Sequence, residues 1–208
     1  MDRSLYIDGR WVAARSGETI DVVDPATRRL VGRSSLAGAP DVDLAVEAAR
    51  IGFATWSRTP AAERAAILHR AAALVNERVD EIAAALTLEQ GKPLADSRKE
   101  ILFGAVVLDY YAEEGKRLGG SVRPSDRPDI RSIVSWAPLG IVGAIVPWNY
   151  PIDLYCWKIG PALAAGNAVI VKPPLETPLA VGLLVQALHD AGLPAGVLAD
   201  LPGGIEAG

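Results

Sequence analysis

The sequence is poor in the residues that build disulfides and metal centres. Its 208 residues include one cysteine, Cys156, and two histidines, His69 and His189. A single cysteine excludes an internal disulfide, and the lack of paired cysteines excludes the usual zinc patterns. We therefore expect no metal site and a reducing, cytoplasmic location.

An excess of positive charge is also lacking. Lys and Arg number 21 against 25 Asp and Glu, which gives a formal net charge of −4. No basic face is available for a nucleic acid, so we expect no nucleic-acid partner. Because 50% of the residues are hydrophobic, the chain can bury a core, and intrinsic disorder is excluded.

Long uninterrupted apolar helices are missing as well. Residues 133–152 carry no charge over twenty positions, about the length that spans a bilayer. Three prolines and two glycines within this stretch would break a helix, so it predicts buried strands and turns. The start of the chain, Met1–Ser4, lacks the apolar core of a signal peptide. We expect no membrane partner.

The first 120 residues predict short strands followed by helices. A hairpin is expected around Asp8 and Gly9, and a strand at 20–23 is expected to pair with 30–31. Thr59 and Pro60 fit the N-cap and first position of a helix. With that helix, apolar spacing and stop signals predict four helices, at 40–56, from Pro60 onward, through 82–88 to Gly91, and at 96–118.

Residues 121–138 predict a β-hairpin. Turn-forming residues at 124–128 separate a short polar run from an apolar run at 130–136. An edge strand with exposed apolar residues is avoided by solitary proteins. We therefore expect this hairpin to project and to pair with another subunit.

From residue 139 the pattern is that of an α/β fold. Apolar runs at 141–146, 168–171 and 197–201 alternate with helical runs at 154–165 and 178–191. Continuous Val- and Ile-rich runs between helices predict parallel strands covered on both faces. Residues 203–208 resemble the opening of a further helix.

Two motifs follow the first two of these strands, where open α/β sheets bind ligands. In Pro147–Pro151, two prolines fix the backbone, and the amide of Asn149 can donate a hydrogen bond to a developing oxyanion. In the second motif, Lys172 can bond a ribose hydroxyl or a phosphate. On the residues alone, ordinary strand-end turns explain both motifs equally well.

Together, the segments resemble the aldehyde dehydrogenase superfamily over the whole chain. The matching segments are Ile7–Trp11, Val23–Thr27, Ala45–Ala49, Glu89–Pro93, Pro138–Val142, Pro147–Pro151, Trp157–Asn167, Lys172–Pro173 and Gly192–Val197. A single segment of this kind is not specific to the family, but their order and spacing together are.

This resemblance implies an NAD(P)+-dependent oxidation of an aldehyde to a carboxylate, with NAD or NADP as cofactor and a small hydroxy- or semialdehyde as substrate. It implies a helical N-terminal region (1–120), an oligomerisation hairpin (121–138) and the first part of a Rossmann-like dinucleotide-binding domain (139–208), with the catalytic domain absent. A homodimer or homotetramer is implied for the full-length enzyme.

The resemblance also assigns roles to residues. It implies that Asn149 is catalytic and donates its amide to the oxyanion of the thiohemiacetal. It implies a cofactor site formed by Val146, Pro147, Trp148, Asn149, Lys172, Pro173, Pro174 and Leu175. It implies an aldehyde tunnel walled by Tyr150, Asp153 and Trp157.

The departures from the family pattern concern the nucleophile and the cofactor. The family's nucleophilic cysteine and general-base glutamate lie in later motifs that this chain does not reach, and we expect Cys156 to be a buried inert thiol. Many NAD-using members carry a glutamate where this chain has Leu175, and Glu176 is expected to point elsewhere.

Two other readings of the chain stay open. It is either a truncated, inactive fragment that serves as a binding or structural piece, or an unrelated doubly wound nucleotide-binding module. We expect His69 and His189 to be surface or helix-terminal residues, and Glu89 to be a capping residue.

Overall fold

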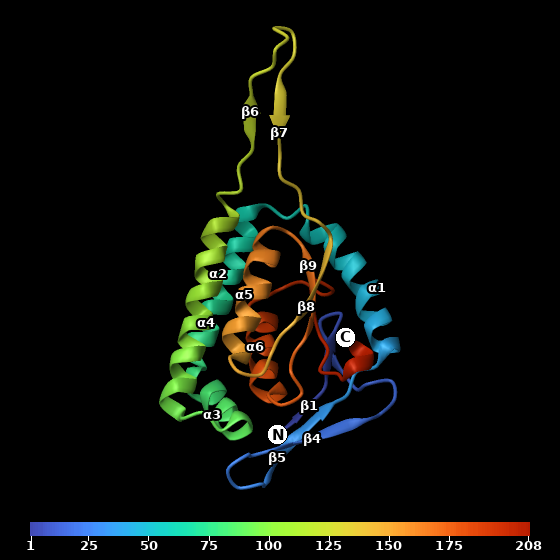
Figure 1. Ribbon diagram of the computed structural model, residues 1–208, viewed down its shortest axis with the longest axis vertical. Coiled ribbons are helices and arrows are strands. Elements are labelled where there is room, and N and C mark those ends of the chain that lie inside the picture. Colours follow the sequence, from blue (N-terminus) through green and yellow to red (C-terminus); the bar gives the residue numbers. More distant parts are fainter.

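A computed structural model describes residues 1–208, whose elements are drawn in Figure 1. The strands are β1 (Asp2–Arg3), β2 (Leu5–Ile7), β3 (Arg10–Val12), β4 (Thr19–Val23), β5 (Leu30–Ser35), β6 (Ser121–Arg123), β7 (Ser132–Val134), β8 (Ile141–Ile145), β9 (Ala168–Lys172) and β10 (Leu198–Asp200). The helices are α1 (Ala39–Trp56), α2 (Ala61–Glu77), α3 (Val79–Gln90), α4 (Leu94–Gly115), α5 (Pro151–Ala164) and α6 (Pro178–Asp190), with a 3-10 turn at Ile205–Ala207.

The central sheet confirms the α/β prediction. Its strand order is β3-β2-β10-β9-β8, in which β8, β9 and β10 run parallel and β2 pairs antiparallel with β10. Strands from the first twelve residues therefore complete the same sheet as the strands after residue 139. Val169 and Val171, which share one face of β9, are fully buried, whereas Ile170 on the other face is only half-buried although α1 packs there.

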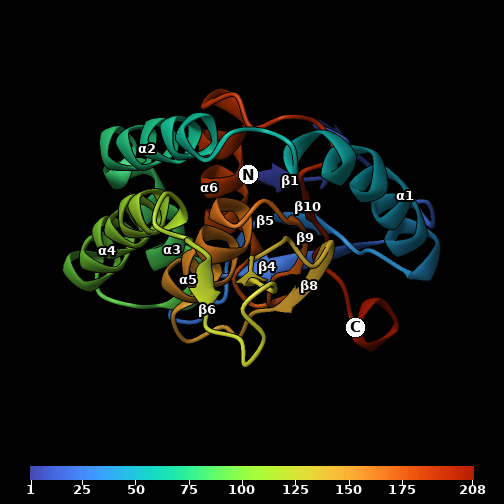
Figure 2. The ribbon, with the colours of Figure 1, turned by 90° about the horizontal axis from the view of Figure 1, so that it is seen from above.

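The helices form layers on either side of the sheet, as Figure 2 shows from above. α1 packs against β8, β9 and β10 on one face, while α5 packs on the other face and contacts α6. Outside this pair, α2, α3 and α4 form a further layer. The indole of Trp56 is buried and donates to the carbonyl of Leu163 at 3.0 Å, which ties the end of α1 to α5.

A buried ion pair ties the N-terminus to the sheet. Arg3 pairs with Asp200 on β10, and both side chains are almost fully buried. The hydroxyl of Tyr155 on α5 donates to Asp200 at 3.1 Å. Burial lowers the pKa of Arg3 to about 10 and raises the pKa of Tyr155. A charged pair in this position is stabilising only while all of its partners are present.

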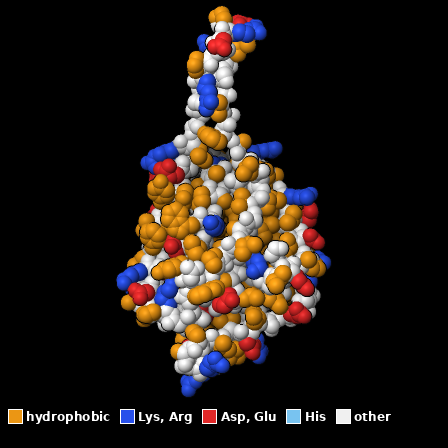
Figure 3. Space-filling view, viewed as in Figure 1, with side chains coloured by type: hydrophobic (Ala, Val, Ile, Leu, Met, Phe, Trp, Pro, Cys, Tyr) orange, Lys and Arg blue, Asp and Glu red, His pale blue; other side chains and the backbone are white.

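The hairpin of β6 and β7 stands clear of the body, as predicted (Figures 1 and 3). Val122, Ile133 and Trp136 on this hairpin are 69%, 72% and 73% exposed. Large apolar side chains are therefore presented on a two-stranded arm that has no core of its own.

Several helix ends differ from the sequence expectation. Pro60 is the N-cap of α2, not its first helical residue, and the Thr59 hydroxyl bonds back to Thr55 at 3.2 Å instead of capping. α5 begins at Pro151, three residues early, since proline suits the first turn. α4 runs from Leu94 to Gly115, and residues 203–208 form only a 3-10 turn.

No helix of the chain has both the length and the apolar character needed to cross a membrane.

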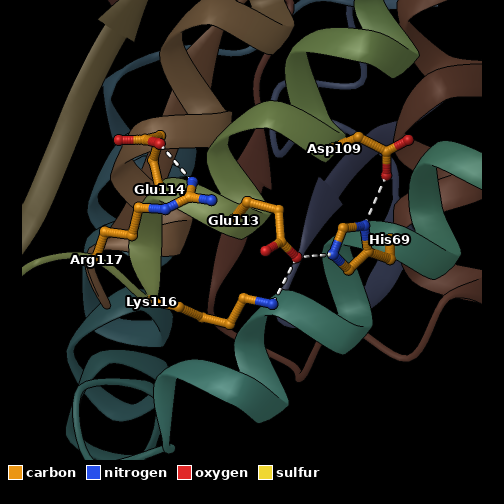
Figure 4. A network of polar contacts seen from close by, with 6 residues as sticks. All are labelled: His69, Asp109, Glu113, Glu114, Lys116 and Arg117. Atoms are coloured by element: carbon orange, nitrogen blue, oxygen red, sulfur yellow. Dashed lines mark hydrogen bonds and ion pairs between the residues drawn. The ribbon is translucent and has the colours of Figure 1, made fainter.

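His69 joins α2 to α4 (Figure 4). Its Nδ1 lies 2.8 Å from Asp109 and its Nε2 lies 2.8 Å from Glu113. Since both nitrogens face carboxylates, both must donate, which only the charged imidazolium does. The hydrogen bond to Asp109 raises the pKa of His69 above its ordinary value of 6.5. The expected surface position is confirmed, but the histidine is a contact between helices.

Replacing His69 by glutamine should lower the melting temperature more in acid than in alkali. Native His69 holds its proton above pH 6.5, where the unfolded chain releases it. Its stabilisation is therefore complete below that pH and is lost as pH rises through the raised native pKa. The effect is small, since the side chain is 40% exposed.

Thermal unfolding at about pH 5.5 and about pH 9 measures this difference. Glu114→Gln, which removes the neighbouring surface pair with Arg117, is the control: the melting temperature of this variant should keep the pH dependence of the parent chain. An equal penalty from His69→Gln at both pH values would contradict the assignment.

Candidate active site

The first motif forms a tight turn between β8 and α5, which we call the Asn149 turn (residues 147–150). Val146, just after β8, is buried and donates its N–H to the carbonyl of Lys172 at 3.1 Å. Trp148 and Tyr150 are 56% and 50% exposed, and Asn149 is exposed as well. The turn thus leaves the sheet at its carboxyl edge and presents polar and aromatic side chains outward.

Side chains from the end of α3 and the loop after it hold this turn by its main chain. Gln90 Nε2 donates to the carbonyls of Trp148 at 2.6 Å and Asn149 at 3.0 Å. Lys92 Nζ donates to the same Asn149 carbonyl at 3.2 Å and lies 4.0 Å from the centre of the Tyr150 ring. The carbonyl of Asn149 therefore accepts two hydrogen bonds from outside the turn.

Glu100 on α4 completes the arrangement. Its side chain is fully buried, forms an ion pair with Lys92, and accepts the N–H groups of Ile152 at 3.0 Å and Asp153 at 3.4 Å. These are free amides at the N-terminus of α5, where a carboxylate is favourable. Sequence reasoning missed Gln90, Lys92 and Glu100. The matching segment Glu89–Pro93 was the one signal, but it does not indicate what these residues contact.

The turn borders an open cleft of about 750 Å³, the Asn149 cleft. Tyr150 and Asp153 line it together with Asn149. Burial raises the pKa of Asp153, with a further rise from the nearby Glu100 carboxylate. One oxygen of Asp153 is buried without a hydrogen-bond partner.

Trp157, about one turn beyond Asp153 on α5, is 39% exposed and is not among the residues that line the Asn149 cleft. Its ring packs 5.9 Å from Tyr111 and 6.4 Å from Phe103, centre to centre. Phe103 does line the cleft, so Trp157 is placed behind this wall.

Lys172 ends β9 beside the Asn149 turn, since Ile145 and Lys172 are paired in the parallel register. Its side chain makes no hydrogen bond or ion pair. It lines a mostly apolar cleft of about 350 Å³, the Lys172 cleft, with Gly143, Ile145 and residues of α1. A Cβ on Gly143 would meet nothing within 4 Å, so the sheet face here is open. An unpaired cation beside an open apolar face fits one wall of a dinucleotide site.

Leu175 and Glu176 face another cleft. They line a space of about 770 Å³, the Leu175 cleft, with Trp148, Glu89 and residues of β4. Leu175 is half-buried and Glu176 is exposed, although both residues border this space, so the expectation that Glu176 points elsewhere stays a prediction. Pro173 and Pro174 are buried beneath the loop. Trp148 borders both the Asn149 cleft and the Leu175 cleft.

Glu89 caps a helix, as expected, but the helix is α6 rather than its own. Its two oxygens accept the N–H groups of Leu179 at 2.7 Å and Ala180 at 2.8 Å. Burial raises the pKa of Glu89 to about 8, which the two hydrogen bonds oppose. Cys156 is a fully buried free thiol, also as expected, and burial raises its pKa.

The profile of the Aldehyde dehydrogenase family matches residues 11–208. The chain belongs to the aldehyde dehydrogenase family. It is 42% identical over 201 residues to glutarate-semialdehyde dehydrogenase of Pseudomonas putida, covering 97% of this chain and 42% of that protein. It is 40% identical to the succinate-semialdehyde dehydrogenase [NADP(+)] GabD of Escherichia coli, covering 94% of this chain and 40% of that protein.

Solved structures agree with the fold. An E. coli NADP dependent enzyme superposes with a TM-score of 0.97 at 39% identity, over 99% of this chain and 43% of that one. PnpE in complex with nicotinamide adenine dinucleotide superposes with a TM-score of 0.95 at 41% identity, over 98% of this chain and 42% of that one. The chain thus spans about two-fifths of the length of the relatives it matches.

Proposed function

We propose that the chain supplies the oxyanion donor and one wall of the coenzyme cleft to an NAD(P)+-dependent aldehyde dehydrogenase. The enzyme converts an aldehyde, NAD(P)+ and water to a carboxylate, NAD(P)H and two protons. The observation that carries the proposal is the pairing of Ile145 with Lys172, which sets the Asn149 turn and Lys172 at one edge of the sheet. Family membership supports the same reaction.

In this proposal, the coenzyme lies across the carboxyl ends of β8 and β9. Lys172 holds the ribose. Pro147, Trp148, Asn149 and Leu175 form the accessible part of the wall, and the buried Val146, Pro173 and Pro174 lie behind it. NAD(P)+ supplies the hydride acceptor when bound. One relative is named as NADP-dependent, and PnpE is described with NAD, which supports use of either coenzyme.

The aldehyde is proposed to enter through the Asn149 cleft. Asn149 donates its side-chain amide to the oxygen that becomes negatively charged, with Tyr150 and Asp153 in the wall and Trp157 behind it. We propose a small hydroxy- or semialdehyde as substrate. The names of several relatives support this class, including the glutarate- and succinate-semialdehyde dehydrogenases.

A second candidate function is favoured by the burial of the lone thiol. Cys156 is inaccessible, so these 208 residues offer no cysteine nucleophile of their own. Taken alone, the chain then acts as an inactive binding or structural piece. Purified 208-residue chain should show no NAD(P)+-dependent aldehyde oxidation, whereas a protein that continues to the length of the relatives should show it.

Asn149→Ala in the full-length enzyme should reduce the rate of acylation by about 10²–10³, because one preorganised oxyanion donor is lost. Binding of coenzyme and aldehyde should change little, since the effect is confined to the transition state. Single-turnover kinetics measure it. Asn76→Ala, at an exposed position on α2, is the matched control. A tenfold or smaller loss would reduce Asn149 to a structural turn residue.

The coenzyme preference should follow the charge near Leu175. Without a carboxylate there, repulsion of the 2′-phosphate of NADP is lost, and we expect use of both coenzymes. Leu175→Glu should shift the ratio of kcat/KM toward NAD by about ten- to a hundredfold.

Glu176→Gln tests whether the neighbouring carboxylate, which shares the Leu175 cleft, already plays this part. A preference for NAD greater than about a hundredfold in the parent enzyme, retained in Glu176→Gln, would show that Leu175 does not relax the site.

The hairpin of β6 and β7 is proposed to join subunits into a homodimer or homotetramer. Ile133→Lys should weaken assembly of the full-length enzyme, because it places a charge on the exposed apolar arm. Ile51→Lys on α1 is the matched control, as Ile51 is 74% and Ile133 72% exposed. Sedimentation at micromolar concentration measures the state. A monomeric parent enzyme, or equal dissociation in both variants, would contradict the proposal.

A further inference from the structure

The Asn149 turn is held by side chains that lie about sixty positions earlier in the chain. Gln90 and Lys92 both donate to the Asn149 carbonyl, and they come from opposite sides of Gly91. Gly91 ends α3 in the left-handed region, with φ of 82°, so the chain reverses there and both neighbours reach the turn.

Each donor is itself fixed. Gln90 also donates to the Trp148 carbonyl, so its amide bridges two consecutive peptide groups. Lys92 is paired with Glu100, and the exposed fractions of the two side chains are 13% and 0%. Glu100 in turn accepts the first amides of α5, directly after the turn. The peptide groups on both sides of Asn149 are thus anchored to α3 and α4.

This arrangement holds the main chain from which the Asn149 side chain projects. Asn149 is exposed, and no hydrogen bond is made by its own amide, so packing alone does not aim it. An oxyanion donor is effective only when it is oriented before the charge develops. Loss of a main-chain anchor would let the amide turn away without removing it.

We propose that Lys92 and Gln90 are positioning residues for Asn149, with Glu100 holding Lys92 in place. This inference rests on the proposed function, because it requires Asn149 to stabilise the oxyanion. It assigns to the segment Glu89–Pro93 a part in the rate of the reaction: Gln90 and Lys92 border the Asn149 cleft, but they act through the main chain of Asn149 and need not touch the aldehyde carbon.

The test compares Lys92→Met, Lys92→Arg and Lys116→Met in the full-length enzyme. Lys116 also pairs with a glutamate of α4, Glu113, but beyond the opposite end of that helix, so Lys116→Met controls for loss of a lysine–glutamate pair. Lys92→Met should lower kcat by about tenfold and leave KM for the aldehyde within about twofold, because ground-state contacts remain. Lys92→Arg, which keeps the charge and the donors, should recover most of the rate. Lys116→Met should match the parent enzyme.

Gln90→Leu tests the second donor and keeps the proposal testable if Lys92→Met does not fold. It should also lower kcat with little change in KM. Neither effect should persist in an Asn149→Ala background, where no amide remains to be aimed. This background separates positioning from a general loss of stability.

The results that would overturn the inference differ from those that would overturn the proposed function. If Asn149→Ala abolishes acylation while Lys92→Met and Gln90→Leu keep the parent kcat, the positioning role is wrong and the oxyanion role stands. If the Lys92 and Gln90 variants lower kcat equally in the Asn149→Ala background, they act on something other than Asn149. If Asn149→Ala itself has no effect, the proposed function fails first.

Discussion

The parallel pairing of β8 with β9 is the constraint on which the rest of the site depends. Five residue pairs from Ile141–Ala168 to Ile145–Lys172 set the register, and the β9 valines are fully buried on one face of the sheet. Polar groups cannot enter such a strand without a partner, so chemistry is confined to the strand ends. Parallel strands end at the same edge, and this places the Asn149 turn next to Lys172 whatever the surrounding loops do.

Because of the same constraint, the main chain of the Asn149 turn needs hydrogen-bond partners from other parts of the chain. A turn that leaves the carboxyl edge of a sheet and opens a helix carries free carbonyls on one side and free amides on the other. Here the carbonyls of Trp148 and Asn149 are taken by Gln90 and Lys92, and the amides of Ile152 and Asp153 by Glu100. The helical layer is therefore part of the site rather than a cover for the sheet.

The sequence predicted those parts of the fold in which neighbouring residues decide the outcome. Apolar runs marked β8 and β9, the turn-forming stretch at 124–128 marked the projecting hairpin, and the carboxyl ends of the strands located Asn149 and Lys172. Contacts between distant segments were not predictable in this way. Nothing in the alternation of Leu5–Ile7 shows that β2 pairs antiparallel with β10, and nothing near Lys92 shows that it reaches Asn149.

The predictions of helix ends missed contacts for the same reason. Pro151 suits the first turn of α5, but the carboxylate that accepts the first amides of this helix lies on another helix, more than fifty positions away. Glu89 was expected to cap locally and instead caps α6. In both cases, a glutamate of the helical layer satisfies the N-terminus of a helix that packs on the sheet.

This pattern explains why three carboxyl groups are buried in a chain of this size. Glu89, Glu100 and Asp200 are each at most 4% exposed, and burial of a carboxyl group is costly unless hydrogen bonds or an opposite charge offset it. Each of the three has such partners: helix amides for Glu89, helix amides and Lys92 for Glu100, and Tyr155 with Arg3 for Asp200. Apolar replacements would fill the same space but would leave the α5 and α6 amides without acceptors. The buried carboxylates therefore fix where these helices begin, and the start of α5 determines where the Asn149 turn must end.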